Sequence, residues 1–161
     1  MRFIPDAKLW VIGSGDIVKK LKKMVSNLDL DDQIKFFGRI TLENLWDYTS
    51  RADIGISLEE DLGLNYQYAL PNKLFDYIQA RIPVVISDLP EMKEIVEKYA
   101  IGKILNERTP HKLADLIKGM IKDELSKGVY NTNLELAARE LCWEREEDKL
   151  ITLFRHVNNS T

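Results

Sequence analysis

Short runs of β-branched and aromatic residues alternate along the chain with longer stretches in which apolar residues recur every three or four positions. This alternation is typical of a parallel sheet whose strands are joined by helices. The strands are expected at residues 8–12, 33–37, 53–57, 83–87 and 102–105. The helices between them are expected at about 16–28, 42–51, 71–81 and 90–99. The pattern predicts a Rossmann-like α/β fold, a doubly wound parallel sheet of about five strands flanked by helices.

The pattern changes after the last expected strand, because only helical periodicity follows. One helix opens at Thr109 and Pro110, and two further helical segments are expected at about 133–141 and 143–157. Residues 158–161 show no periodicity and are expected to form a disordered tail. No repeat, low-complexity tract or linker divides the rest, so residues 1–157 are interpreted as one domain with a helical C-terminal appendage.

The composition excludes several classes of protein. The chain has 161 residues, with 23 Lys and Arg against 26 Asp and Glu, which gives a formal net charge of −3. Nucleic-acid-binding and polybasic membrane-surface proteins usually carry a basic surplus, so this balance disfavours both. The single cysteine, Cys142, excludes an intrachain disulfide framework and a thiolate-rich metal site. The amino terminus has no apolar signal core and no apolar run is long enough to cross a bilayer, so we expect a cytoplasmic protein.

The turn formed by Gly13, Ser14 and Gly15 follows the first expected strand and opens a helix. Two glycines let the backbone approach a phosphate closely, and a helix N-terminus favours an anion. A tight turn that binds nothing explains the same residues. The dinucleotide fingerprint fails because Val18 stands where its third glycine would be, which disfavours a nicotinamide-dependent oxidoreductase.

Two further candidate sites follow the third strand. Glu59, Glu60 and Asp61 come directly after an apolar run and have the chemistry to accept hydrogen bonds from sugar hydroxyls or to ligate a hard cation; a solubilising loop is the simpler alternative. Lys73 lies in the first turn of the helix that Pro71 opens, where a cation opposes the helix dipole and therefore indicates an anionic partner. An ordinary surface salt bridge between Lys73 and Asp76, three residues apart, is the alternative.

Other residues with reactive side chains give weaker signals. His111 and His156 lie in polar helical surroundings without a nearby nucleophile or a metal-ligand spacing, and both are interpreted as surface residues. Cys142 beside Trp143 is interpreted as a packing residue.

Taken together, these loops resemble the C-terminal, donor-binding domain of GT-B glycosyltransferases of the "group 1" family, also called family four. The most specific part is the stretch from Pro71 to Val85, which resembles the family's P-N-K-x-F-E-Y helix and the strand after it. The other similar stretches, in the family's order, are 9–16, 34–40, 51–57 and a tryptophan at Trp143 that opens the last helix.

The resemblance implies a role for each matching residue. Glu60 matches the glutamate near the transferred sugar because Gly63 follows it as in the family's E-x-F-G, and Asp76 matches the glutamate that binds the ribose hydroxyls. Lys73 is expected to contact phosphate. The nucleotide donor is also expected to lie against the loops after the first three strands and the start of this helix, through Gly13, Ser14, Gly15, Arg39, Ile40, Gly63 and Asn72. The sequence departs from the family in its aspartate at 76, its Arg81 in place of glycine, and a longer spacing between the two acidic residues.

The resemblance implies a retaining transferase without a metal or other cofactor, whose donor is a UDP-, GDP- or ADP-sugar and whose acceptor is a glycan or a lipid-linked glycan. The family's first β–α unit of this domain and its N-terminal acceptor domain have no counterpart here. We therefore expect the donor-binding part of a longer enzyme of polysaccharide biosynthesis. This part is expected to be inactive alone, and peripheral association of the longer enzyme with a membrane is compatible with the resemblance. The alternative is a noncatalytic nucleotide-binding or protein-interaction module with a flavodoxin-like sheet. Without the central strand of the family's sheet, the five strands are expected to close into a single sheet in the order 2-1-3-4-5.

Overall fold

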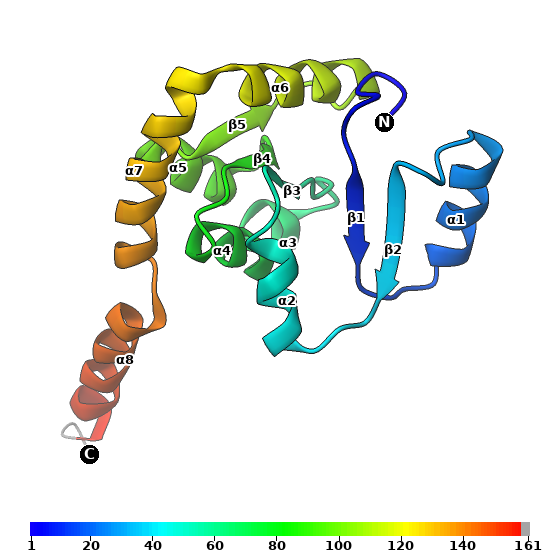
Figure 1. Cartoon of the computed structure of the whole chain (residues 1–161). Helices are drawn as coiled ribbons and strands as arrows, with labels where there is room; N and C mark the ends of the chain where they lie inside the picture. Colours follow the sequence, from blue (N-terminus) through cyan, green and yellow to red (C-terminus); the bar gives the residue numbers. More distant parts are fainter. Residues whose placement is uncertain (159–161) are drawn as a thin grey trace.

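The computed structural model describes residues 1–158, with side chains described for residues 1–123 and 128–155. Parallel strands alternate with helices in the expected order (Figure 1). The strands are β1 (Leu9–Ile12), β2 (Ile34–Gly38), β3 (Gly55–Ser57), β4 (Val84–Ser87) and β5 (Gly102–Leu105). The helices are α1 (Val18–Asn27), α2 (Leu42–Thr49), α3 (Leu64–Gln67), α4 (Asn72–Gln79), α5 (Pro90–Tyr99), α6 (Pro110–Lys122), α7 (Glu124–Glu140) and α8 (Trp143–Asn158). The predicted Rossmann-like α/β class is confirmed.

The helices differ from the sequence prediction at two places. The short helix α3 was not expected, and α7 begins at Glu124 instead of near residue 133. Tyr130, Leu134, Ala137 and Ala138 are buried and share one face of α7, so the apolar stripe starts before the expected boundary. Asn158, expected to begin the disordered tail, is the last residue of α8, and residues 159–161 lie outside the described residues.

The predicted single sheet in the order 2-1-3-4-5 is wrong. The strands form two separate parallel sheets, β1–β2 and β3–β4–β5, and no hydrogen-bonded ladder joins β1 to β3 (Figure 1). The place of the strand that the family has between them is therefore not closed. Each sheet keeps an edge strand at the position where closure was expected, and an unpaired edge of this kind is a template for another strand.

Two contacts lie on either side of this gap. The ring of Phe3, just before β1, stacks on the ring of His111 in α6 with centroids 3.8 Å apart, which ties the start of β1 to that helix. On the other side, the Tyr77 hydroxyl of α4 donates to the carbonyl oxygen of Ile56 at 3.5 Å. The Gly55 N–H donates toward β4, and successive residues of a strand point their backbone groups to opposite sides, so the Ile56 carbonyl faces the free edge of β3. Tyr77 therefore donates to a carbonyl that a neighbouring strand would otherwise bind.

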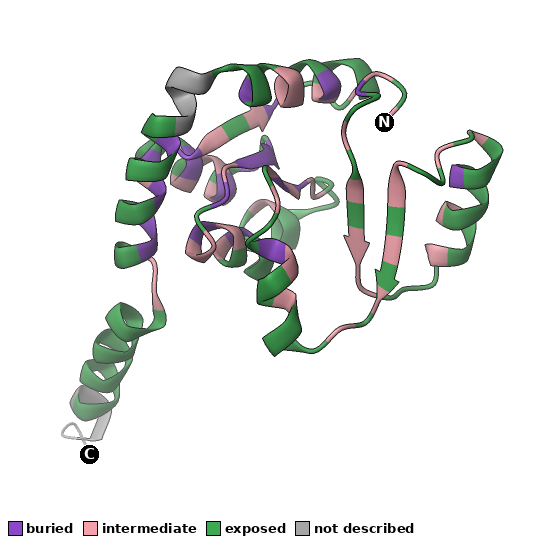
Figure 2. Ribbon diagram, viewed as in Figure 1, coloured by how far each residue is buried: buried purple, intermediate pink, exposed green. Residues whose placement is uncertain are grey.

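The hydrophobic core belongs to the second sheet. Its buried residues come from α4 to α7, centred on Leu74, Ile78, Ile86 and Met92, all with 0% exposure. In the β1–β2 part, Ile4 and Val25 are the only buried apolar side chains (Figure 2). The helix α8 extends away from both sheets (Figure 1), and the apolar side chains between residues 143 and 155 are exposed. The strength of packing therefore differs greatly between the two halves of the chain.

Gly55 in β3 is needed because the ring of Tyr77 lies directly over its Cα. A Cβ atom at residue 55 would overlap that ring, so we expect Gly55→Ala to lower the free energy of unfolding by about 1–3 kcal/mol. The matched control is Gly119→Ala in α6, where a Cβ meets no atom within 4 Å. It should raise the stability by about 0.5–1 kcal/mol, because alanine favours a helix. Urea denaturation measures both changes, and equal effects would contradict the close approach of Tyr77.

Candidate functional site

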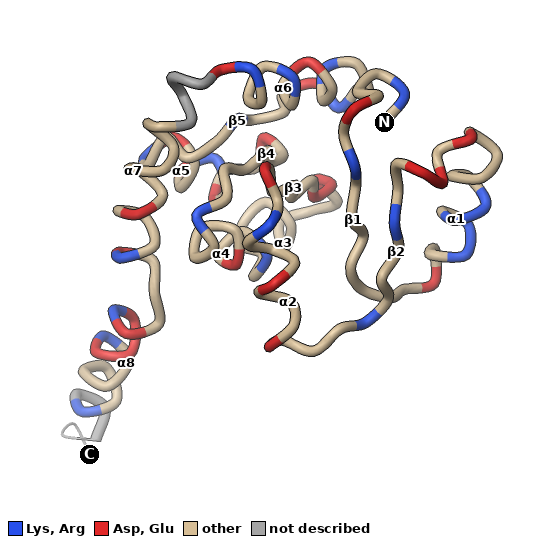
Figure 3. Tube along the Cα trace, viewed as in Figure 1, with Lys and Arg blue, Asp and Glu red and all other residues tan. Residues whose placement is uncertain are grey.

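Acidic residues follow β3 directly (Figure 3), and the three carboxylates of this loop, Glu59, Glu60 and Asp61, have different partners. Glu59 forms an ion pair with Lys73, with Oε1 and Nζ 2.5 Å apart. Asp61 accepts two hydrogen bonds from the Gln67 amide at 3.0 and 3.1 Å. Glu60 is exposed and its carboxylate makes no hydrogen bond or ion pair with any residue that the structure describes. Of the three, Glu60 is therefore the carboxylate that remains available to a ligand, and it is the one that the family motif singled out.

The helix α4 presents Asn72, Lys73 and Asp76 in its first two turns, while Leu74 and Ile78 face the core. The anionic partner that Lys73 requires against the helix dipole is Glu59, not Asp76, so the alternative pairing within the helix is not formed. Partial burial of Asp76 raises the pKa of its carboxyl above the ordinary value, because the charged form loses solvation. Asp76 is thus a carboxylate without an ion-pair partner among the described residues.

Two residues that the sequence analysis missed hold the acidic loop in place. The Ser87 hydroxyl, at the end of β4, donates to the carbonyl oxygen of Glu59 at 2.6 Å. Arg108, in the loop after β5, donates from Nη1 to the same oxygen at 2.6 Å and from Nη2 to the Leu58 carbonyl at 3.4 Å. Each follows a strand at its carboxyl end, and that position was the one available sequence signal.

At the base of this loop, the Ser57 hydroxyl is fully buried and has no hydrogen-bond partner, the only such side-chain atom in the part of the chain that the structure describes. An orphaned buried hydroxyl costs stability.

The glycine turn lies at the other group of loops. Gly13 has a φ of 131° and donates from its backbone N–H to the Gly38 carbonyl at 2.7 Å, so the loops after β1 and β2 meet. Ser14, Gly15 and Arg39 are exposed, and Ile40 is half-buried. The helix α1 begins without a side-chain cap and without an acidic residue in its first turn. The N–H of Val18 donates to the Gly15 carbonyl at 3.1 Å, and the next N–H groups of the first turn keep the capacity to bind an anion.

The predicted site residues fall into two groups along the fold. Glu60 and Gly63 lie in the loop after β3, and Asn72, Lys73 and Asp76 lie in α4, which the ion pair of Lys73 with Glu59 joins to that loop. Gly13, Ser14 and Gly15 lie in the loop after β1, and Arg39 and Ile40 lie in the loop after β2. No hydrogen bond or ion pair between described residues connects the two groups. Both lie at the carboxyl ends of parallel strands, where ligands of open α/β sheets bind.

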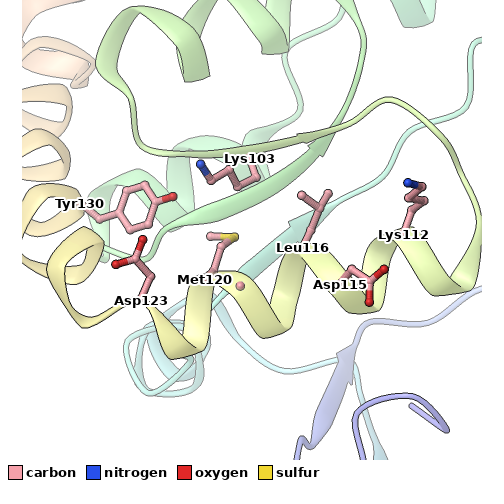
Figure 4. Close-up of a pocket in the computed structure, with 8 residues that line it drawn as sticks. Lys103, Lys112, Asp115, Leu116, Met120, Asp123 and Tyr130 are labelled. Carbon is pink, nitrogen blue, oxygen red and sulfur yellow. The ribbon is translucent and has the colours of Figure 1, made fainter.

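Two cavities lie outside these loops. One, of about 440 Å³, lies between α6, β5 and α7 and is lined by Lys103, Leu116 and Tyr130 among others (Figure 4). The other, of about 280 Å³, lies beside Asp53 and Pro83, at the amino ends of β3 and β4. Neither includes a predicted site residue. Within the described part of the chain, no three His, Cys, Asp or Glu side chains gather closely enough to hold a metal ion, and no helix is long and apolar enough to span a membrane.

The sequence matches known glycosyltransferases. The sequence profile described as "Glycosyl transferases group 1" matches residues 2–140. A chitobiosyldiphosphodolichol β-mannosyltransferase of Candida albicans is 28% identical over 130 residues, which cover 74% of this chain and 26% of the relative. The chain therefore spans about a quarter of the length of this relative.

Solved structures show the same fold. The sucrose-phosphate synthase of Thermosynechococcus elongatus superposes with a TM-score of 0.79 and 20% identity, over 98% of this chain and 40% of the synthase. HepE of Anabaena, in a structure with UDP and glucose, superposes with a TM-score of 0.74 and 17% identity, over 92% of this chain and 40% of HepE. These structures are GT-B glycosyltransferases, and this chain spans less than half of each. The chain belongs to the group 1 family of glycosyl transferases, and its fold is the Rossmann-like half of the GT-B fold.

Proposed function

We propose that this chain is the donor-binding part of a retaining glycosyltransferase that takes a hexose from a UDP-, GDP- or ADP-sugar and transfers it to a glycan or lipid-linked acceptor. The observation that carries the proposal is the arrangement around α4. The Lys73 ammonium is held at the loop after β3 by its ion pair with Glu59, the unpaired Glu60 carboxylate lies next in that loop, and Asp76 lies one turn after Lys73 in α4. The UDP and glucose in the structure of HepE support a nucleotide-sugar as the ligand.

The roles follow from the chemistry of each group. An ammonium has three N–H donors, so Lys73 can keep Glu59 and also bind a phosphate oxygen. Asp76 accepts the two ribose hydroxyls, and Glu60 accepts hydroxyls of the sugar. The uncapped N-terminus of α1 and the Gly13–Gly15 turn bind the diphosphate, and Arg39 with Ile40 lies against the base.

Catalysis in this proposal is electrostatic. Breaking the bond from the sugar to the diphosphate places negative charge on the leaving phosphate, which backbone N–H groups, a helix N-terminus and the Lys73 cation stabilise. No resident metal or other cofactor is part of the proposal. The chain by itself is proposed to lack transferase activity, because the acceptor must be held by another part of the parent enzyme.

Calorimetric titration of the chain with UDP, GDP and ADP tests the proposal. One of these should bind, and Lys73→Met should weaken that binding at least about tenfold, because a charged hydrogen bond to phosphate is worth about 1.5–3 kcal/mol. Lys122→Met, at the exposed end of α6, is the matched control and should bind as the wild type does. If none of the three diphosphates binds, or if Lys73→Met binds as tightly as the wild type, the alternative of a noncatalytic nucleotide-binding or protein-interaction module would describe the chain better.

A further inference from the structure

The loop that carries Glu60 has no regular structure of its own between β3 and α3, so its shape depends on contacts from elsewhere. The Glu59 carbonyl oxygen accepts hydrogen bonds from Ser87 and from Arg108, both at 2.6 Å, which uses both lone pairs of that oxygen. The second Arg108 bond, to Leu58 at 3.4 Å, adds a contact one residue earlier. One guanidinium therefore spans two consecutive peptide groups directly before Glu60.

The charge of Arg108 also suits this place. Three consecutive carboxylates repel one another, and Lys73 pairs with only one of them. The guanidinium donates to main-chain carbonyls and not to a carboxylate, so it brings positive charge to the loop while Glu60 stays unpaired. Arginine offers donors in a fixed fork, whereas lysine can make only a point contact and cannot hold the same two carbonyls in one geometry.

We propose that Arg108 is a positioning residue for sugar recognition: by holding the Leu58 and Glu59 carbonyls, it fixes the direction in which the Glu60 carboxylate meets the donor sugar. This inference rests on the proposed function. The inference extends the proposed function because it assigns a role to Arg108, in the loop after β5. Ser87 assists by holding the same Glu59 oxygen from the end of β4.

The test separates sugar recognition from binding in general. The affinity of the chain is measured by calorimetry for the nucleoside diphosphate that binds and for its glucose and mannose conjugates, and the ratio gives the gain due to the sugar. Arg108→Ala should reduce that gain about three- to tenfold, the value of one net hydrogen bond, and leave the affinity for the diphosphate within about twofold. Arg108→Lys should retain part of the affinity gain due to the sugar. Arg51→Ala, an exposed arginine before the amino end of β3, is the matched control.

A second measurement needs no ligand. A Glu-specific protease should cut after Glu59 or Glu60 about tenfold faster in Arg108→Ala, because local opening of the loop exposes its backbone. Cleavage after Glu146, in the exposed helix α8, serves as the internal reference and should not change.

Each contrary result has a definite meaning. An unchanged gain from the sugar, a wild-type chain that binds the diphosphate and both conjugates equally, or an equal weakening of every ligand overturns the inference. An unchanged cleavage rate in the loop overturns it as well. A wild-type chain that binds no nucleotide overturns the proposed function, and the role of Arg108 in sugar recognition falls with it.

Discussion

Backbone amides of β4 are expected to exchange with solvent at least about a thousandfold more slowly than those of β1 and β2. Val84, Val85 and Ile86 have 0% exposure, and β4 lies between two paired strands. In contrast, β1 has one neighbouring strand and no buried residue, and Trp10 is 39% exposed. The amides of β1 should therefore become exposed by a local opening that leaves the core of the second sheet intact.

The size of the difference follows from the free energies involved. Core amides exchange through global unfolding, at about 5–15 kcal/mol for a typical domain, whereas weakly packed elements open at much lower cost. A difference of about 4 kcal/mol corresponds to a thousandfold ratio in protection. Native-state hydrogen exchange with residue-resolved detection measures it. If β1, β2 and β4 exchange with the same protection, the two sheets unfold as one cooperative unit, which would contradict the weak packing of the β1–β2 part.

The strands and their order along the chain were predictable because each is a short apolar run bounded by polar or glycine residues. For example, the run that forms β4 is buried at all four positions and reads as a central strand from its side chains alone. The separation of the two sheets was not predictable in this way. Strand pairing depends on which edges can meet, and that depends on contacts between distant parts of the chain, such as Phe3 with His111 and Tyr77 with Ile56, which local patterns do not show.

The candidate site shows the same division between local and tertiary signals. That Lys73 needs an anionic partner follows from its place in the first turn of α4, which is a local property. That the partner is Glu59 follows from the packing of β3 against α4, which the sequence does not show. From the sequence, Asp76, three residues away on the same helix, was an equally reasonable partner. Arg108 carried no signal beyond its place after the carboxyl end of β5, because it acts on carbonyls about fifty residues away. The assignments of Glu60, Asp76 and the glycine turn to sugar, ribose and diphosphate remain predictions.

Replacing Asp76 with asparagine is expected to make the protein slightly more stable at pH 7 and much poorer at binding nucleotide. Burial raises the pKa of the Asp76 carboxyl in the folded chain above its unfolded value, so the folded state binds the proton more tightly. Stability associated with this group is therefore present at low pH and is lost as the pH rises through the raised pKa. At pH 7 the ionised carboxylate opposes folding, and the neutral amide removes that cost.

The stability gain should be small because Asp76 is largely exposed and solvent screens its charge. We expect a rise in Tm of about 1–2 °C at pH 7 that vanishes below about pH 4, where the wild-type carboxyl is itself protonated. The binding loss should be large. A carboxylate accepts hydrogen bonds from both ribose hydroxyls, and their loss corresponds to about 1.5–3 kcal/mol, or about ten- to a hundredfold in Kd.

Thermal unfolding across pH 3–8 and calorimetry with the nucleoside diphosphate measure the two effects of Asp76→Asn on one sample. Asp32→Asn is the matched control, because Asp32 is exposed and precedes the amino end of β2, the opposite end of the strands from the site. A variant that loses stability together with binding would show that Asp76 supports the fold. A variant that keeps its affinity would remove Asp76 from the ribose site. A gain in stability together with a loss of affinity is the result expected for a ligand-binding carboxylate. Its charge destabilises the free protein, and the ribose hydroxyls compensate for that cost only when the nucleotide binds.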